Sequence, residues 1–208
     1  MAVDSYSALK SAIGTYLGDT AQDSNRDDFI DLFEAWANRV LRHTAMEEQT
    51  TLTTNSSGLA TLPTGYLDIR SVRYSASPSR ELKPLSIGSL NRLSPYDTAG
   101  TVYAYTITSI SNVQKIRIID PLDAASLVVT YFEKIPALSD SQTTNWLLDL
   151  SPDLYFYGSL AQAYAWRRQF EVAAGLQAKA QQVVDEISSI DERGRYGNAE
   201  IVLPGVNP

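Results

Sequence analysis

The sequence predicts an α+β protein, in which helices from both chain ends form a bundle, an antiparallel β-rich region is inserted between them, and an extended tail follows. Apolar residues recur at helical spacing near both ends, and they alternate with polar residues in the middle of the chain. The last residues contain Gly and Pro without a helical period. We therefore expect a helical domain over residues 1–49 and 136–192, a β-rich domain over residues 50–135 and an extended C-terminal tail over residues 193–208.

Two amphipathic helices are predicted in the first 46 residues. Asp4 is expected to cap the first helix and Gly18 to end it. Ser24 and Asp27 have the spacing of a capping box at the start of the second helix. Neither helix can bury its apolar stripe alone, so an antiparallel hairpin is expected. The stripes comprise Tyr6, Leu9, Ile13, Tyr16 and Leu17 in the first helix, and Phe29, Leu32, Phe33, Trp36, Val40 and Leu41 in the second.

The period changes near residue 50, where strands and tight turns are predicted. The stretch "TTLTTNSSGLATLP" has two β-prone arms around an Asn-Ser-Ser-Gly turn, which indicates a β-hairpin. A further strand is expected in "YLDIRSVRYSA", and three more between residues 102 and 135. Ser111-Asn112 is expected to turn the first of these three onto the second, and Pro121-Leu122-Asp123 the second onto the third. Ile116 and Ile118 alternate with Lys115 and Arg117, which predicts a sheet with one solvated face.

The most apolar stretch of the chain, "TNWLLDLSPDLYFYGSLAQAYAW", is predicted to contain a buried helix of the bundle. Ser151-Pro152-Asp153 has the pattern of a helix start, and the residues that follow are apolar over most of the helical circumference. A final helix carries Leu176, Val183, Val184, Ile187 and Ile190. The residues expected in the bundle core are Trp36, Leu154, Tyr157, Leu160 and Tyr164.

Composition excludes several classes of function. The chain has 208 residues, no cysteine and a formal net charge of −7, which does not suit a protein that grips nucleic acid through clustered Lys and Arg. Without cysteine there is no disulfide, thiol nucleophile or Cys-zinc site. The apolar runs are shorter than the ~18 residues that a membrane span requires, so no membrane partner is expected.

The inventory of catalytic residues is poor, and we expect no enzyme, no cofactor and no metal site. His43 is the only histidine, and its place late in the second predicted helix favours a structural role. The acid pairs Asp27-Asp28, Glu47-Glu48 and Asp191-Glu192 lie at predicted helix ends, where solvated acids are common. No nucleotide-binding loop, nucleophile elbow or zinc-protease motif is present. Most aromatic residues fall on helical stripes or strand faces, which favours core packing over ligand stacking.

Short apolar motifs in the second half of the chain carry a resemblance. They are Tyr131-Phe132, "IPALS" at residues 135–139, "TNWLL" at residues 144–148, "PDLY" at residues 152–155, and then Gly158 and Leu160-Ala161; "LPTGYLDIRSVRY" lies earlier in the chain. With the order of helices and strands, they resemble the head-to-tail adaptor (connector) proteins of tailed bacteriophages, the tail-tubular-A-like adaptors of short-tailed phages. Residues 86–101 match no part of that pattern that we can place.

The resemblance implies a structural virion protein of the phage neck, assembled in the host cytoplasm. Such adaptors form a ring, commonly dodecameric, that docks beneath the portal protein, meets a tail nozzle or tail tube protein and surrounds the passing genomic DNA without specific binding. An acidic chain suits a channel along which DNA slides. Because each copy carries a charge of −7, we expect the isolated chain to be monomeric or weakly associated. We expect the tail to dock into the portal or an adjacent subunit through Arg193, Arg195, Tyr196, Ile201, Val202 and Leu203.

Two alternatives from other classes stay open at the level of sequence. One is a carbohydrate- or peptide-binding module in the β-rich region, using Tyr66, Tyr74, Tyr96, Tyr103 and Tyr105. The other is a small hydrolase that uses pairs of Asp and Glu residues facing each other across a cleft.

Overall fold

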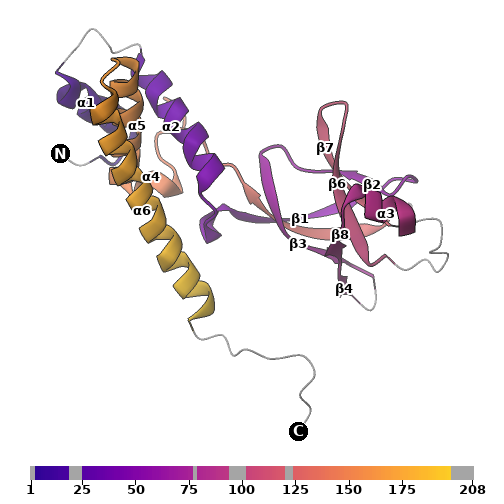
Figure 1. Ribbon diagram of the computed structural model, residues 1–208. Helices are drawn as coiled ribbons and strands as arrows, with labels where there is room; N and C mark the ends of the chain where they lie inside the picture. The colour runs from indigo at the N-terminus through magenta and orange to yellow at the C-terminus, as the bar shows by residue number, and fades with distance from the viewer. Residues whose placement is uncertain (1–2, 19–24, 77–78, 94–101, 120–123, 198–208) are drawn as a thin grey trace. The chain divides into compact units, whose positions relative to one another are not determined.

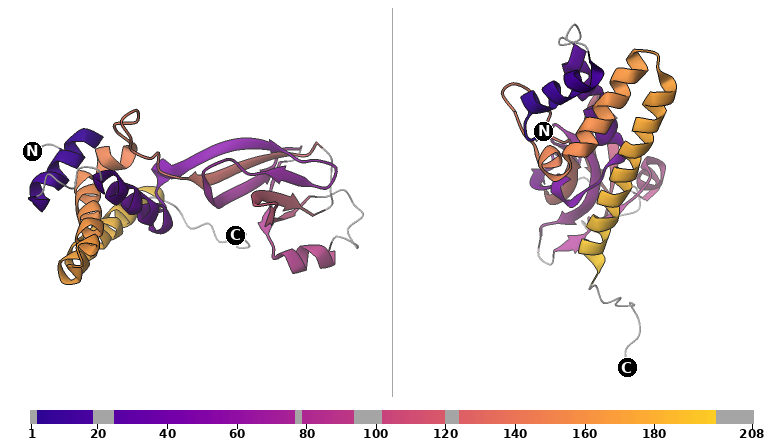
Figure 2. Two further views of the ribbon diagram at one scale, coloured as in Figure 1. Left: turned by 90° about the horizontal axis from the view of Figure 1, so that it is seen from above. Right: turned by 90° about the vertical axis from the view of Figure 1, so that its left-hand side faces the viewer.

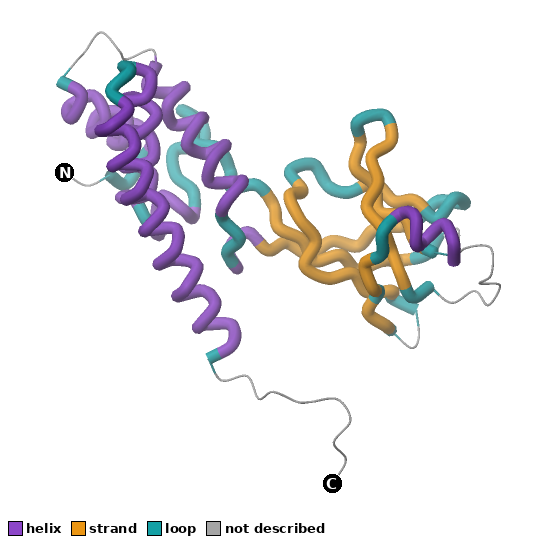
Figure 3. Tube along the Cα trace, viewed as in Figure 1, coloured by secondary structure: helices purple, strands orange, loops and turns teal. Residues whose placement is uncertain are grey.

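A computed structural model describes residues 3–18, 25–76, 79–93, 102–119 and 124–197. The chain divides into two compact units, one from Met1–Ala45 and Ile135–Pro208 and the other from Met46–Lys134. The first contains helices from both chain ends, and the second contains the strands (Figures 1 and 3). The predicted α+β class, with a bundle of N- and C-terminal helices and an inserted β-rich region, is confirmed.

The helical unit is organised around one central helix, α5. This helix contacts each of the other four helices described for the unit, and in Figures 1 and 2 it runs beside α6. Neighbours on several sides explain why α5 is apolar over most of its circumference. The helices are α1 (Tyr6–Leu17), α2 (Arg26–Val40), α4 (Trp146–Leu150), α5 (Pro152–Trp166) and α6 (Phe170–Tyr196).

The helix ends agree only in part with the sequence-based prediction. Gly18 ends α1 in the left-handed conformation, with φ of 64°, as predicted. Ser5, not Asp4, caps α1, because its hydroxyl accepts the hydrogen bond from the Ala8 amide. Ser24 lies outside the described residues. Pro152 starts α5 as predicted, but Ser151 donates its hydroxyl to the Asp153 carboxylate at 2.6 Å instead of capping the helix.

The buried face of α2 is rotated from the predicted stripe. Leu32 and Val40 are exposed, whereas the face of α2 that packs inward also contains an acid, Glu34. In α5, Trp166 is 56% exposed. The buried residues of α2 are Phe29, Ile30, Phe33, Glu34 and Ala37, and those of α5 are Leu154, Tyr155, Gly158, Ser159, Leu160, Ala161 and Ala163.

The residues predicted for the bundle core differ in burial. Leu154 and Leu160 are fully buried, while Trp36, Tyr157 and Tyr164 are only partly buried. The last helix also continues further than predicted, to Tyr196, so that the first four residues of the expected tail are helical. Residues 198–208, which hold the rest of that tail, lie outside the described residues.

The described residues of the β unit form two four-stranded sheets, ordered β1-β8-β3-β4 and β2-β7-β6-β5. All pairs are antiparallel except β5–β6, which is parallel. The short helix α3 (Ile87–Leu93) lies in the stretch that matches no expected element. The strands are β1 (Glu47–Thr53), β2 (Leu59–Thr61), β3 (Tyr66–Tyr74), β4 (Arg80–Glu81), β5 (Lys83–Pro84), β6 (Ala104–Ile110), β7 (Val113–Ile118) and β8 (Ser126–Glu133).

Two predicted strand pairings are wrong. The Asn-Ser-Ser-Gly turn forms, with the Gly58 amide donating to the Asn55 carbonyl at 2.8 Å, but its two arms enter different sheets. Likewise β8 does not pair with β7, and instead lies between β1 and β3. The turn predicted at Pro121-Leu122-Asp123 lies outside the described residues.

The hairpin of β6 and β7 is confirmed. Ser111 and Asn112 both have positive φ, 53° and 61°, as a two-residue hairpin turn requires. Ile116 and Ile118 are buried, while Lys115 and Arg117 are partly exposed. One core cluster takes residues from both sheets, among them Ala60, Val72, Ile116, Ile118, Leu127 and Val129. Among the described helices of both units, none has the length and apolar character that spanning a bilayer requires.

Candidate interaction surfaces

A buried network of hydrogen bonds connects the segment of residues 135–145 to the helices. The Glu34 carboxylate on α2 accepts hydrogen bonds from the Leu138 amide and the Tyr155 hydroxyl, both at 2.9 Å. The Asn145 side chain donates to the Tyr155 hydroxyl at 2.6 Å and caps α4 by accepting from the Leu148 amide at 2.9 Å. The network therefore fixes α4 and the start of α5 against α2.

Burial sets the protonation behaviour of this network. Glu34 is only 5% exposed, and desolvation raises its pKa although the bonds from Leu138 and Tyr155 act in the opposite direction. Burial and the neighbouring Glu34 raise the pKa of Tyr155 as well, which keeps its hydroxyl a donor. The network therefore needs Glu34 chiefly as a hydrogen-bond acceptor, and charge on the buried carboxyl is a cost to the fold.

We expect Glu34→Gln to match the wild type in unfolding free energy near pH 4, below the ordinary pKa of 4.5, and to exceed it near pH 8. The folded pKa of Glu34 lies above its ordinary value of 4.5, so the wild type loses stability as the pH rises through that folded pKa. Gln does not titrate, and its advantage therefore grows with pH. Glu34→Leu, which removes the acceptor from two buried donors, is expected to lose about 2–4 kcal/mol. Urea unfolding at both pH values measures these free energies. A Gln variant whose unfolding free energy drops below that of the wild type as the pH rises contradicts the prediction.

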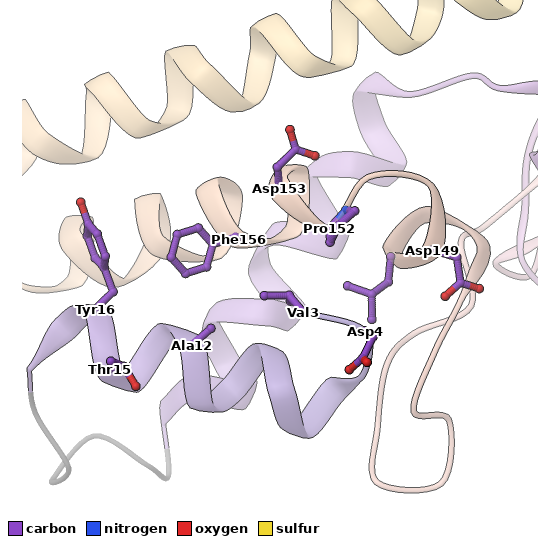
Figure 4. Close-up of a pocket in the computed structure, with 10 residues that line it drawn as sticks. Val3, Asp4, Ala12, Thr15, Tyr16, Asp149, Pro152, Asp153 and Phe156 are labelled. Atoms are coloured by element: carbon purple, nitrogen blue, oxygen red, sulfur yellow. The ribbon is translucent and has the colours of Figure 1, made fainter. Parts of the chain in front are cut away.

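An open groove of about 940 Å³ runs between α1, α4 and the start of α5 (Figure 4). Tyr16 and Phe156 form one end, with their rings edge to face at a centroid distance of 5.7 Å. In Figure 4, Val3 lies between α1 and α5. The Tyr16 side chain is 56% exposed although it lies on an apolar wall. The apolar lining comprises Val3, Ala12, Tyr16, Leu148, Pro152 and Phe156.

The groove, here called the acidic groove, carries one sign of charge. Asp4, Asp149 and Asp153 line it, and no Lys or Arg is among its described lining residues. In Figure 4, Asp4 and Asp149 lie toward the end away from Tyr16. Because the groove is open, it does not enclose a small molecule as a ligand pocket does. Its chemistry suits an apolar side chain accompanied by a cation from another protein surface.

The end of α6 is held to the segment after α2 by a polar cluster around Asp191. Arg195 pairs with Asp191 at 2.7 Å and donates from Nε to the Thr44 hydroxyl at 2.8 Å, and that hydroxyl donates to Asp191. His43 Nε2 lies 3.5 Å from Asp191, and its ring stacks on Trp146 at 5.3 Å. Burial alone raises the pKa of Asp191, but the Thr44 bonds and the neighbouring His43 and Arg195 side chains hold it below its ordinary value.

His43 and Arg195 do not have the surroundings that the sequence predicted for them. His43 is not in α2, which ends at Val40, and its Nδ1 accepts from the Ala45 amide at 3.0 Å. Arg195, expected in the docking tail, already binds within its own chain. Arg193 is exposed and donates to the Ser189 carbonyl at 3.3 Å. The side chain of Tyr196 and the whole of Ile201, Val202 and Leu203 lie outside the described residues.

The acid pairs do not meet across a cleft in the described structure. Asp27 pairs with Lys10 at 3.2 Å, Glu47 pairs with Arg70, and Asp191 belongs to the cluster above. Within the part of the chain that the structure describes, no group of three or more His, Asp or Glu residues could hold a metal ion.

The tyrosines considered for ligand binding pack inside the β unit. Tyr105 is buried, and Tyr66 and Tyr74 pack against the same core cluster. Tyr103 packs against a second cluster of Leu90, Ala104 and Ile119. Tyr96 lies outside the described residues. Of the four described tyrosines, Tyr105 is buried and the other three are partly buried, each packed against one of these two clusters.

Sequence reasoning missed both Glu34 and the acidic groove. Glu34 could have been noticed because it lies four residues after Ile30, on a face that is otherwise apolar. The groove had no such signal, because Asp4, Tyr16 and Phe156 fit ordinary roles as cap and core residues. Only the packing of α1 beside α5 brings them together.

Three comparisons with known proteins bear on identity. No curated protein matches the sequence. Among solved structures, the chain is similar to one in the "Neck of empty GTA particle computed with C6 symmetry", with 12% identity, coverage of 75% of this chain and 76% of that chain, and a TM-score of 0.28. The family described as "SU10 adaptor protein" matches residues 4–202, which is nearly the whole chain. The protein with these two units and this acidic groove belongs to the SU10 adaptor protein family.

Proposed function

We propose that this protein is a head-to-tail adaptor of the tail-tubular-A-like type, which forms a ring beneath the portal and joins it to the tail. The observation that carries the proposal is the adaptor family match over residues 4–202. Membership of a structural adaptor family implies a non-enzymatic role. The order of helical and β units along the chain is the order expected for such an adaptor.

The charge of the chain supports the second part of the proposal, that the ring continues the DNA channel. With a formal charge of −7 per copy, a closed ring presents a strongly acidic surface. Such a surface lacks the clustered cations that hold phosphates, so DNA passes without specific binding. Contacts with the portal protein and the tail nozzle or tube protein offset the repulsion between copies.

The C-terminal segment is the proposed portal contact. Ile201, Val202 and Leu203 are apolar, and the Pro204-Gly205 that follows cannot continue a helix. Burying such side chains on a partner contributes about 1.5–3 kcal/mol each before ordering costs. Arg193 and Tyr196, in the last turn of α6, lie next to this segment in sequence, whereas Arg195 serves the intramolecular cluster.

The test mixes the purified protein with the portal protein of the same virion and scores electron micrographs for an added ring. A variant lacking residues 198–208 is expected to melt like the full chain, because α6 ends before the deletion, and to lose ring addition. Equal ring addition by both proteins removes the role of the tail. If the full chain adds no ring to the portal, the adaptor proposal itself fails.

A further inference from the structure

The turn between α5 and α6 presents an exposed apolar surface beside a cation. Phe170 is 67% exposed, which is the highest value among the large apolar side chains of the described residues, and Trp166 and Val172 are 56% and 46% exposed. Arg168 lies in the same turn and is exposed. We call Trp166, Arg168, Phe170 and Val172 the basic corner.

The backbone holds this corner in one shape. The Gln169 amide donates to the Tyr164 carbonyl at 2.9 Å, and the Arg168 amide donates to the Ala165 carbonyl at 3.0 Å. The Arg167 guanidinium donates to the Leu17 carbonyl at 3.1 Å, which ties the corner to the end of α1. Arg168 has φ of 62°, a conformation that glycine adopts more easily than arginine. A cation is therefore present where local backbone preference favours glycine.

The acid-bearing end of the groove and the basic corner are complementary in chemistry but cannot meet within one chain. Asp153 lies in the first turn of α5, and the corner begins at the last residue of that helix, Trp166. The two are thirteen residues apart along the same helix, or about 20 Å. The other end of the groove lies nearer the corner, because Tyr16 contacts Tyr164 at a ring-centroid distance of 6.4 Å. Since α5 is a continuous helix, it keeps the groove carboxylates away from Arg168.

The C-terminal segment is a poorer occupant of the acidic groove than the corner. Residues 198–208 contain Glu200 and no Lys or Arg, so their charge repeats that of Asp4, Asp149 and Asp153. Like charges placed together at an interface disfavour binding. The basic corner supplies an apolar ring and, in Arg168, a cation, which the C-terminal segment lacks; the exposed Glu171 beside Phe170 is an acid that the contact has to leave turned toward solvent.

We propose that the acidic groove receives the basic corner of a second copy of this chain. Phe170 enters the apolar part of the groove, and Arg168 faces the groove carboxylates. Because the two surfaces differ, the contact is heterologous, and repeating it from copy to copy closes a ring when the rotation allows. The inference rests on the proposed adaptor function, and it names the surface through which neighbouring subunits of the ring bind.

Cross-linking between two single-cysteine variants tests the contact, since the chain has no cysteine of its own. Thr15→Cys places a thiol on the groove wall, and Glu171→Cys places one beside Phe170 without removing it. The two variants are mixed, assembled on the portal and treated with a short bismaleimide. Cross-linked dimers are expected from the mixture and not from either variant alone.

Ser189→Cys is the matched control for Glu171→Cys. It is exposed on the same helix, about 27 Å further along, and is expected to give no dimer with Thr15→Cys. Rings that form without dimers from the Thr15→Cys and Glu171→Cys mixture overturn the inference, as do rings in which Thr15→Cys cross-links to the portal instead. Absence of rings for the unmodified chain counts against the adaptor function.

Arg168→Gly gives an independent readout with opposite signs for folding and assembly. Glycine fits the positive φ of this position, so the melting temperature of the isolated variant is expected to rise. Loss of the cation is expected to weaken ring assembly on the portal at least tenfold. A variant that melts higher and assembles like the wild type overturns the role of Arg168 and with it the proposed contact.

Discussion

Leu160→Asp is expected to prevent the helical unit from folding. Leu160 lies on α5, the helix that contacts the other four described helices of its unit, and its side chain is fully buried. An ionised carboxylate placed there loses its hydration without gaining a partner, which costs several kcal/mol, and the lost apolar burial adds to this. The total approaches the 5–15 kcal/mol that typically separates folded from unfolded domains.

Tyr157→Asp is the matched control on the same helix. Tyr157 is only partly buried, and the Lys179 ammonium lies 5.5 Å from its ring centroid, so a carboxylate there keeps water and a nearby cation. We expect a loss of about 1–2 kcal/mol and a cooperative transition that remains measurable. Far-UV circular dichroism during urea unfolding measures both variants. A Leu160→Asp protein that unfolds cooperatively at the wild-type midpoint contradicts the position of Leu160 in the core.

Gly158→Ala is expected to destabilise the protein by about 2–3 kcal/mol, although alanine is the better helix former. A Cβ atom at Gly158 would collide with the ring of Phe33 on α2. That ring has no room to move, because Phe33 is fully buried and packs against Tyr155 at a centroid distance of 4.8 Å. The glycine is therefore required by the close approach of α5 to α2.

Gly175→Ala separates this contact from helix propensity. Gly175 lies within α6, and a Cβ there meets no atom within 4 Å. We expect it to gain about 0.5–1 kcal/mol, because the helix interior favours alanine when space is available. Thermal and urea unfolding of the two variants should shift in opposite directions. If both variants are stabilised, α5 and α2 do not pack as closely at Gly158 as the structure shows.

Local features of the fold could be predicted because their causes are local. Gly18 ends a helix and Pro152 starts one through the backbone conformations they allow, and Ser111-Asn112 adopts the positive φ values of a tight turn. The helical and alternating periods likewise follow from how successive side chains point along a helix or a strand. Fold class was therefore available from the sequence.

Tertiary structure decided which strands pair and which face of a helix is buried. Several strands of similar composition compete for partners, and β8 pairs with β1 and β3 because its alternate residues Leu127 and Val129 then enter the core shared by both sheets. Helical spacing shows which residues share a face of a helix, but it does not fix which of two neighbouring faces turns toward the core. In α2, packing against α5 selects the face that contains Glu34. The free-energy cost of burying this carboxyl group is offset by hydrogen bonds from Tyr155 and Leu138, which lie in distant parts of the chain.

Some features of the candidate surfaces were visible in the sequence, and others arise only from packing. Apolar residues near the chain end and the short adaptor-like motifs were readable in order along the sequence. The acidic groove was not, because Asp4, Tyr16 and Phe156 come together only when α1 packs beside α5. The exposure of Phe170 was equally hidden, since the same residue at the start of a helix is buried or exposed according to where neighbouring helices end. The sequence by itself determined what each segment becomes, whereas tertiary packing determined which side chains remain at the surface for a partner, because exposure depends on contacts between residues far apart in the chain.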